Sequence, residues 1–143
     1  MLSIKLVAVG KCESYFAEAV TEYAKRLTKY CNFEIAQIKN SDIKGETDAI
    51  RPHLKGYVIL CAIQGELVSS ESLAAKLEKL SHTTSSITFI IGGSDGVGNY
   101  LDGLIHEKIS FGRATFPHQL FRVIIAEQLY RSFTILNNEK YHK

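Results

Sequence analysis

The sequence predicts a single α/β domain with a mainly parallel sheet. Short apolar runs typical of strands alternate along the chain with longer segments whose apolar residues recur at helical spacing. The chain has 143 residues, and 45% of them are hydrophobic. That length suits one compact core and leaves little room for a second, so we expect one domain over residues 1–143.

The first half of the chain alternates strand and helix signals. Gly10 and Gly65 each interrupt an apolar run and are expected to end a strand there, and Pro52 limits its own segment to a short helix at most. The run 57–63 is apolar throughout, as expected for a central strand covered on both faces. The expected strands are 2–9, 33–38 and 57–63, and the expected helices are 16–30 and a short one within 48–55.

The second half continues the alternation and ends in an unusually apolar segment. Ser69 or Ser70 can cap a helix that runs to about Leu80, and Pro117 stands where a first-turn proline is favoured. The expected strands are 87–91 and 108–111, and the expected helices are the one from Ser69 or Ser70, a short one over 100–107 and a long one over 118–136. The long helix is apolar on most of its circumference, so it must be buried by its own domain or by a partner.

Composition limits the location and the cofactors of the protein. No stretch approaches the roughly 20 consecutive apolar residues of a membrane-spanning helix, and no secretory signal precedes the first strand. Cys12, Cys31 and Cys61 form no CxxC pair and have no histidine cluster beside them, which argues against a disulfide framework and a zinc site. We therefore expect a cytoplasmic protein without a metal. The net charge of +2 permits a polyanionic partner without predicting one.

Three strand ends carry unusual loops, after Ile63, Ile91 and Phe111. In open α/β sheets, ligands bind beyond the carboxyl ends of the strands. The segment 92–98 is rich in glycine, but it lacks the G-x-G-x-x-G spacing of dinucleotide-binding proteins and the Gly-Lys-Ser/Thr ending of a Walker A loop. Its glycines expose main-chain groups to a ligand or simply make a tight turn, and the sequence leaves both interpretations open.

Charged residues at helical spacing mark the last helix. His118 and Arg122 share one helix face, where they bind a ligand or act as a cap and a surface charge. Glu127 and Arg131 repeat that spacing within apolar surroundings, which favours a structural ion pair. The chain then ends with Tyr141, His142 and Lys143, which could form one wall of a site or simply fray.

Several of these segments together resemble the ribosomal RNA large subunit methyltransferase H family of the SPOUT superfamily. Each motif is weak alone, but their order and spacing make the match specific, and it extends from one end of the chain to the other. The matching segments are Leu6 to Lys11, Thr21 to Tyr23, the Ile-Gly-Gly-x-x-Gly loop at Ile91 to Gly96, the Thr-Phe-Pro-His turn at 115–118, Arg122, Glu127 to Arg131 and the terminal Tyr-His-Lys.

The resemblance implies a fold and a reaction that periodicity alone does not show. The family fold has a C-terminal trefoil knot, in which S-adenosyl-L-methionine binds in a bent conformation. The family acts as a homodimer, which would bury the apolar last helix. Its reaction is methylation at N3 of a pseudouridine in large-subunit (23S) ribosomal RNA, as free RNA or in the assembled ribosome.

The resemblance also implies which residues form the site. The cofactor-binding positions are Leu60, Cys61, Gly92, Phe111, Gly112, Arg113, Ala114, Thr115 and Phe116. In the family the position of Ala114 often carries a larger apolar residue, which changes the fit around the cofactor. His142, on its own or on a partner's tail, is the candidate base for the imide proton of the acceptor. Arg122 and Arg131 are candidates for binding RNA phosphate or the uracil oxygens, with Tyr141 beside them.

Two other functional classes compete with this interpretation. A non-catalytic RNA-binding or ribosome-binding module would explain the mild basicity but has no use for a small-molecule pocket. A flavodoxin-like or other nucleotide-binding enzyme would explain the alternating pattern and the glycine-rich loop, but the chain lacks a phosphate-binding loop. Binding of S-adenosyl-L-methionine separates the methyltransferase from both.

Overall fold

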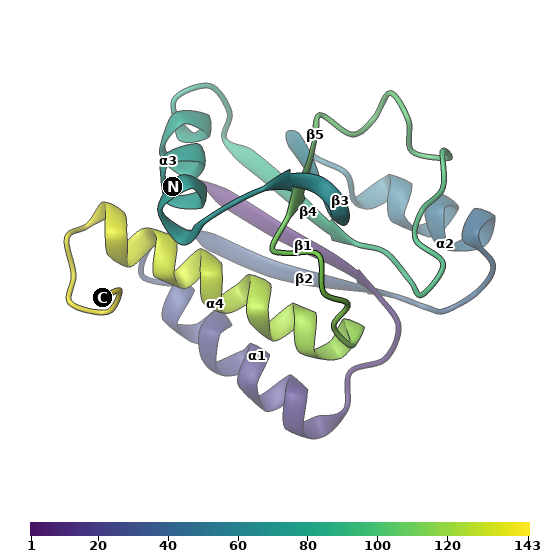
Figure 1. Cartoon of the computed structure of the whole chain (residues 1–143), viewed down its shortest axis with the longest axis horizontal. Helices are drawn as coiled ribbons and strands as arrows, with labels where there is room; N and C mark the ends of the chain where they lie inside the picture. The colour runs from purple at the N-terminus through teal and green to yellow at the C-terminus, as the bar shows by residue number, and fades with distance from the viewer.

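A five-stranded sheet, parallel throughout, forms the centre of the molecule (Figure 1). The computed structural model describes every residue from Met1 to Lys143. The strand order is β2-β1-β4-β3-β5, so the connection after β3 leads across to β4 and the chain then returns to the far edge for β5. The strands are β1 (Ser3–Val9), β2 (Asn32–Ile38), β3 (Tyr57–Leu67), β4 (Ser86–Ile91) and β5 (Glu107–Ser110).

Helices cover the two faces of the sheet unequally. Three of them, α1 (Ser14–Leu27), α3 (Ser70–Ser81) and α4 (His118–Leu136), pack on one face, and α2 (Ile43–Ile50) packs on the other (Figure 1). A 3-10 turn, Arg51–His53, follows α2. None of the helices combines the length and the apolar character that a lipid bilayer would require of a spanning segment.

Alternation along β1 explains the two cores. Leu6 and Ala8 point into the cluster that includes α1, α3 and α4, whereas Val7 and Val9 point into the cluster beneath α2. All six residues of β4, the central strand, are buried. The predicted α/β class and parallel sheet are therefore confirmed, with both faces covered as parallel strands require.

Three predicted elements differ from the structure. The helix expected within 48–55 begins earlier, at Ile43, because the carboxylate of Asp42 accepts a hydrogen bond from the amide of Gly45 at 2.8 Å and caps it. The prediction that Gly65 ends the third strand is wrong: β3 continues through an irregularity to Leu67. A Cβ atom on Gly65 would lie 2.6 Å from the carbonyl carbon of Ile109, so the glycine permits β3 and β5 to approach closely.

The predicted helix over 100–107 is also wrong. That segment forms successive turns, in which the amide of Leu104 bonds to the carbonyl of Leu101 at 2.9 Å. Gly103 has a φ of +84°, a conformation that stops helical propagation. The other long elements agree with the predictions to within three residues; the first helix, expected over 16–30, spans Ser14–Leu27. Ser69 caps α3 in a reciprocal capping box with Ser72, and α4 spans residues 118–136 with Pro117 directly before it.

Candidate functional site

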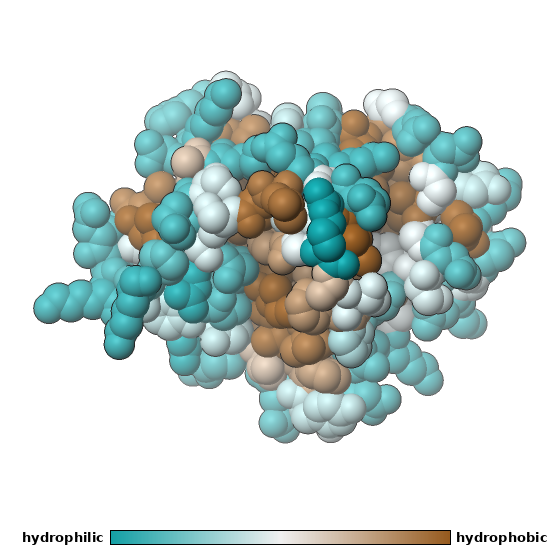
Figure 2. All heavy atoms as spheres, viewed as in Figure 1, coloured by the Kyte–Doolittle hydropathy of each residue, from teal (hydrophilic) through white to brown (hydrophobic).

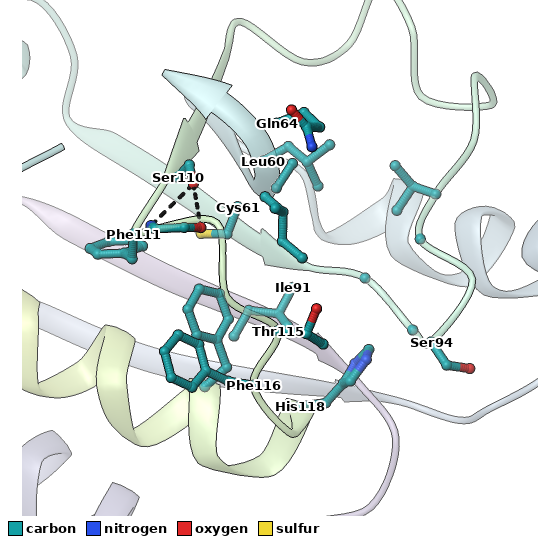
Figure 3. Close-up of a pocket in the computed structure, with 18 of the residues that line it drawn as sticks. Leu60, Cys61, Gln64, Ile91, Ser94, Ser110, Phe111, Thr115, Phe116 and His118 are labelled. Carbon is teal, nitrogen blue, oxygen red and sulfur yellow. Dashed lines mark hydrogen bonds between the residues drawn. The ribbon is translucent and has the colours of Figure 1, made fainter. Parts of the chain in front are cut away.

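A cavity of about 430 Å³ opens at the carboxyl ends of β3, β4 and β5 (Figure 3). Its walls come from the middle of β3, from Leu60 to Gln64, and from the loops after Ile91 and Phe111; the third loop, expected after Ile63, is part of β3. The volume lies within the usual range for small-molecule sites. Half of its twenty lining residues are hydrophobic, so the cavity suits a ligand with a large apolar ring system and a few polar groups.

The glycine-rich loop after β4 forms one wall of the cavity. The amide of Gly96 donates to the carbonyl of Gly93 at 2.9 Å, and Gly96 has a φ of +75°. A Cβ atom on Gly92 would approach the carbonyl carbon of Gly96 and Cγ1 of Val97 to 3.2 Å. The glycines therefore make a tight turn, which confirms that interpretation, and they also line the cavity, so binding of a ligand by this loop stays a prediction.

The loop between β5 and α4 forms the opposite wall. The hydroxyl of Ser110 donates to the carbonyl of Gly112 at 2.9 Å and accepts from its amide at 3.2 Å (Figure 3). Gly112 has a φ of +133°, which allows this closed turn. The ring of Phe116 stacks on that of Phe121 with centroids 6.3 Å apart, which anchors the end of the loop on α4.

Eight of the nine predicted cofactor positions line the cavity. Arg113 is the exception. Its guanidinium donates to the carbonyl of Gly65 at 3.1 Å and also to the carbonyl of Ile63. Arg113 thus fastens the loop after β5 to the outer half of β3, across the mouth of the cavity. We interpret it as a residue that positions the wall and does not itself form it.

Cys61 lies in the wall without the properties of a nucleophile. Burial raises the pKa of its thiol to about 12, so the reactive thiolate is scarce at neutral pH. The chain also lacks any group of three or more His, Cys, Asp or Glu side chains that could hold a metal ion. The polar groups that line this cavity are main-chain atoms and the side chains of Gln64, Ser94, Ser110, Thr115 and His118.

Arg122 lies apart from the cavity although His118, one turn before it, belongs to the lining. Its side chain is buried, and its guanidinium donates to the carbonyls of Val9, at 3.1 Å, and Gly10 and to Oε1 of Gln37 at 3.0 Å. Burial lowers the pKa of this guanidinium, and its Nε has no hydrogen-bond partner. Arg122 was expected to be a surface charge or to face the substrate. Instead it is buried, and its hydrogen bonds connect α4 to the ends of β1 and β2.

The other predicted polar residues gather at the far end of α4. Glu127 and Arg131 form the expected ion pair, with Nη2 and Oε2 2.7 Å apart. The hydroxyl of Tyr141 donates to the same Oε2 at 2.7 Å, so the tail folds back onto the helix. The ring of His142 lies between Nη1 of Arg131 and Oε1 of Glu71, each 3.1 Å from one ring nitrogen.

The contacts of His142 determine its tautomer in this arrangement. An arginine only donates, so Nδ1 of His142 accepts from Arg131 and carries no proton. The ring proton then stands on Nε2 and is donated to Glu71. Arg131 follows the cavity-lining His118 by thirteen residues of α4, which corresponds to roughly 20 Å along a helix. Within one protomer, the tail cluster and the cavity are separate.

The sequence-based prediction missed several residues of the wall. Gln64 and Ser110 contribute polar atoms, and Ile91 and Phe121 contribute apolar surface. Gln64 was missed because the strand was expected to end at this point. Phe121 was missed because helical periodicity identifies the apolar face of a helix but does not show which element packs against that face. Ser110 stands next to the predicted loop, and a serine followed by glycine after a strand is a usable signal for such a turn.

Comparisons with known proteins agree with this geometry. The family model described as "Predicted SPOUT methyltransferase" matches residues 2–142. A protein of Mycoplasmopsis synoviae named ribosomal RNA large subunit methyltransferase H is 43% identical over 151 residues, covering 99% of this chain and all of that protein. Its namesake in Latilactobacillus sakei is 38% identical over 159 residues, with the same coverage.

A solved structure shares the fold at low sequence identity. The probable methylase family protein from Haemophilus influenzae superposes with a TM-score of 0.58 at 15% identity, over 94% of this chain and 66% of that one. This likeness supports the fold alone. The family match and the full-length relatives go further: the chain belongs to the SPOUT methyltransferases, in the ribosomal RNA large subunit methyltransferase H family.

Proposed function

We propose that the protein methylates N3 of a pseudouridine in large-subunit (23S) ribosomal RNA, with S-adenosyl-L-methionine as methyl donor. The observation that carries the proposal is the meeting of three distant segments, the middle of β3 and the loops after β4 and β5, around one small-molecule cavity. Residues 1–143 act as one methyltransferase domain. The relatives are named ribosomal RNA large subunit methyltransferase H, which supports large-subunit ribosomal RNA as the substrate, and we assign the protein to the cytoplasm, where ribosomes are made.

The cavity fits the methyl donor in shape and chemistry. Leu60, Phe111 and Ala114 supply apolar surface for an adenine ring, and the loops of Gly92 and Gly112 present main-chain donors and acceptors. A side chain at Gly92 would crowd Gly96 and Val97, so the wall depends on the absence of a Cβ atom there. The sulfonium donor supplies an activated methyl group when bound, which leaves positioning and exclusion of water to the protein.

The tail cluster provides the groups for the acceptor base. The imide nitrogen must lose its proton as it accepts the methyl group, so a proton acceptor and a stabiliser of the anion are needed. We assign the first role to Nδ1 of His142 and the second to Arg131, with Tyr141 holding the tail in place. Because Arg131 occupies Nδ1 in the protomer, a uracil oxygen would first take over the arginine hydrogen bond and so free the ring nitrogen for the proton.

A homodimer would bring the tail cluster to the cavity. The cluster lies roughly 20 Å along α4 from the cavity wall, so one protomer does not complete the site. A two-fold axis across the middle of α4 would place the tail of each protomer beside the cavity of the other. Apolar atoms gather over α4 on this face of the molecule (Figure 2), and no residue of the helix is fully exposed even in a single protomer. Light scattering that finds a monomer at micromolar concentration would contradict this part of the proposal.

We also propose that the segment after β5 passes through a loop of the chain and forms a trefoil knot. Membership of the SPOUT family supports it, and the contacts of Gly65 with Ile109 and of Arg113 with the carbonyls of Ile63 and Gly65 hold β5 and the loop after it against the outer half of β3. An experimental structure of the dimer tests the knot and the two-fold arrangement together. An unthreaded path from β5 to α4 would refute the knot alone.

Mass spectrometry of large-subunit RNA tests the reaction directly. Cells that lack the gene should carry one pseudouridine without its methyl group, and the purified protein with S-adenosyl-L-methionine should restore it on either free RNA or ribosomes. Calorimetry distinguishes the proposal from a non-catalytic RNA-binding module, because a module would give no heat with the methyl donor, with or without RNA. Within the enzyme, His142→Ala should slow single-turnover methylation; an unchanged rate would eliminate the proton-acceptor role.

A further inference from the structure

A buried carboxylate stands directly behind the glycine-rich wall of the cavity. Glu46 lies in the first turn of α2 and is only 6% exposed. It comes from the face of the sheet opposite α4, from a segment that neither the sequence motifs nor the predicted site includes. Glutamate is seldom buried to this extent unless it is paired or hydrogen-bonded.

The contacts of Glu46 aim one of its oxygens at the cavity wall. Oε2 accepts a hydrogen bond from the amide of Ser41 at 3.0 Å. Oε1 faces Gly93: a Cβ atom on that glycine would lie 2.6 Å from it. Gly93 itself lines the cavity, so a single layer of main chain separates the carboxylate from the space where a ligand would lie.

No cation of the protein neutralises this carboxylate. None of the ion pairs in the molecule includes Glu46. A buried charge with one hydrogen bond and no counter-charge is costly, and a cationic ligand nearby would offset that cost. The geometry therefore favours a positively charged ligand in the cavity over a neutral one of the same shape.

We infer that Glu46 makes the cavity select the charge state of the methyl donor, a specificity role that rests on the proposed function. S-adenosyl-L-methionine carries a positive sulfonium. Transfer of its methyl group to the acceptor nitrogen breaks the carbon–sulfur bond and leaves a neutral thioether, S-adenosylhomocysteine, while the acceptor's proton leaves with the base. Glu46 attracts the first and is indifferent to the second, so it strengthens binding of the methyl donor without strengthening retention of the product.

The size of the effect follows from the layer of main chain between the charges. Two van der Waals contacts in series place the carboxylate roughly 7 Å from a ligand atom against Gly93. For a ligand charge at that distance and an effective dielectric constant of about 20–40, Coulomb's law predicts an effect on affinity of roughly 7-fold to 50-fold. A contribution of that size is well within the resolution of calorimetry.

The test compares Glu46→Gln with the wild-type protein in three titrations. Gln keeps an oxygen that accepts from the Ser41 amide, removes the charge and puts an NH2 group in place of the other oxygen. The ligands are S-adenosyl-L-methionine, S-adenosylhomocysteine and sinefungin, an analogue in which an amine-bearing carbon replaces the sulfonium and supplies a positive charge. We expect the dissociation constants of the two cationic ligands to rise roughly tenfold and that of S-adenosylhomocysteine to change less than about twofold.

Matched controls separate charge selection from loop damage. Asp95→Asn removes one charge from the exposed tip of the same loop and should leave the ratio of the constants unchanged, because solvent screens that position. Glu46→Met, uncharged and of similar length, repeats the measurement if Gln disturbs folding. Equal losses for all three ligands, or no loss for any, would overturn the inference. Failure of the wild-type protein to bind all three would refute the proposed function instead.

Discussion

Complementation between two inactive variants tests whether each site is shared between subunits. The first variant is Ala114→Trp, which places a large ring in the cavity from an exposed loop position that packs into no core. The second is a chain that ends at Lys140 and therefore lacks Tyr141 and His142. Each variant is expected to be inactive by itself, because the tryptophan fills the cofactor cavity of the first and the second lacks the tail residues.

The recovery expected on mixing follows from counting sites. Random exchange of equal amounts gives mixed dimers as half of the population. In each mixed dimer, one site combines a blocked cavity with a missing tail, and the other combines an intact cavity with an intact tail. The mixture should therefore regain about one quarter of the wild-type activity per protomer, because one in four sites is complete.

Transfer of a labelled methyl group to ribosomes that lack the modification measures this recovery. The variants are unfolded together and refolded so that subunits exchange, and each variant refolded alone serves as the control. No recovery after proven exchange would refute a shared site. Such a result would mean that the tail of each protomer reaches the cavity of the same protomer, across the roughly 20 Å of helix that separates them.

Three further predictions address the stability of the fold and the walls of the cavity. Arg122→Met should lower the free energy of unfolding by about 3–5 kcal/mol in urea titrations, because it leaves the buried carbonyls of Val9 and Gly10 without a donor. A loss below about 1 kcal/mol would contradict a stabilising role for these buried hydrogen bonds. In mass spectrometry after brief iodoacetamide treatment at pH 8, Cys61 should react more slowly than Cys12. Both cysteines are partly exposed, but burial raises the pKa of the Cys61 thiol to about 12. Equally rapid labelling of the two would contradict the raised pKa. Arg113→Ala should weaken binding of S-adenosyl-L-methionine in calorimetry while leaving the thermal midpoint nearly unchanged, since it loosens a loop and not the core; an unchanged dissociation constant would mean that the loop holds its shape without the arginine.

Regular elements of the fold could be predicted because their signals are local. Alternation in β1, the apolar run of β4 and the Ser69 cap each act within a few residues, and the structure confirms all three. The rest depends on distant partners. Gly65 resembles a strand terminator until Ile109 is known to lie against it, and Arg122 resembles a surface charge until the carbonyl of Gly10 is known to face it.

The candidate site could likewise be predicted from the sequence only in part. Loops at strand ends could be predicted to converge because the carboxyl ends of parallel strands share one edge of the sheet. Glu46 could not be predicted, because its place behind Gly93 results from the packing of α2 on the opposite face. The position of the tail was equally out of reach, since its contacts with Glu127 and Glu71 join residues far apart in the chain.

The docked tail has a practical consequence for handling the protein. Lys143 follows directly after His142, whose ring is held between Arg131 and Glu71. A histidine tag added there is expected to compete for the carboxylate of Glu71 and displace the imidazole. Met1, by contrast, is 76% exposed and precedes the first strand, so affinity tags and fluorescent labels belong at that end.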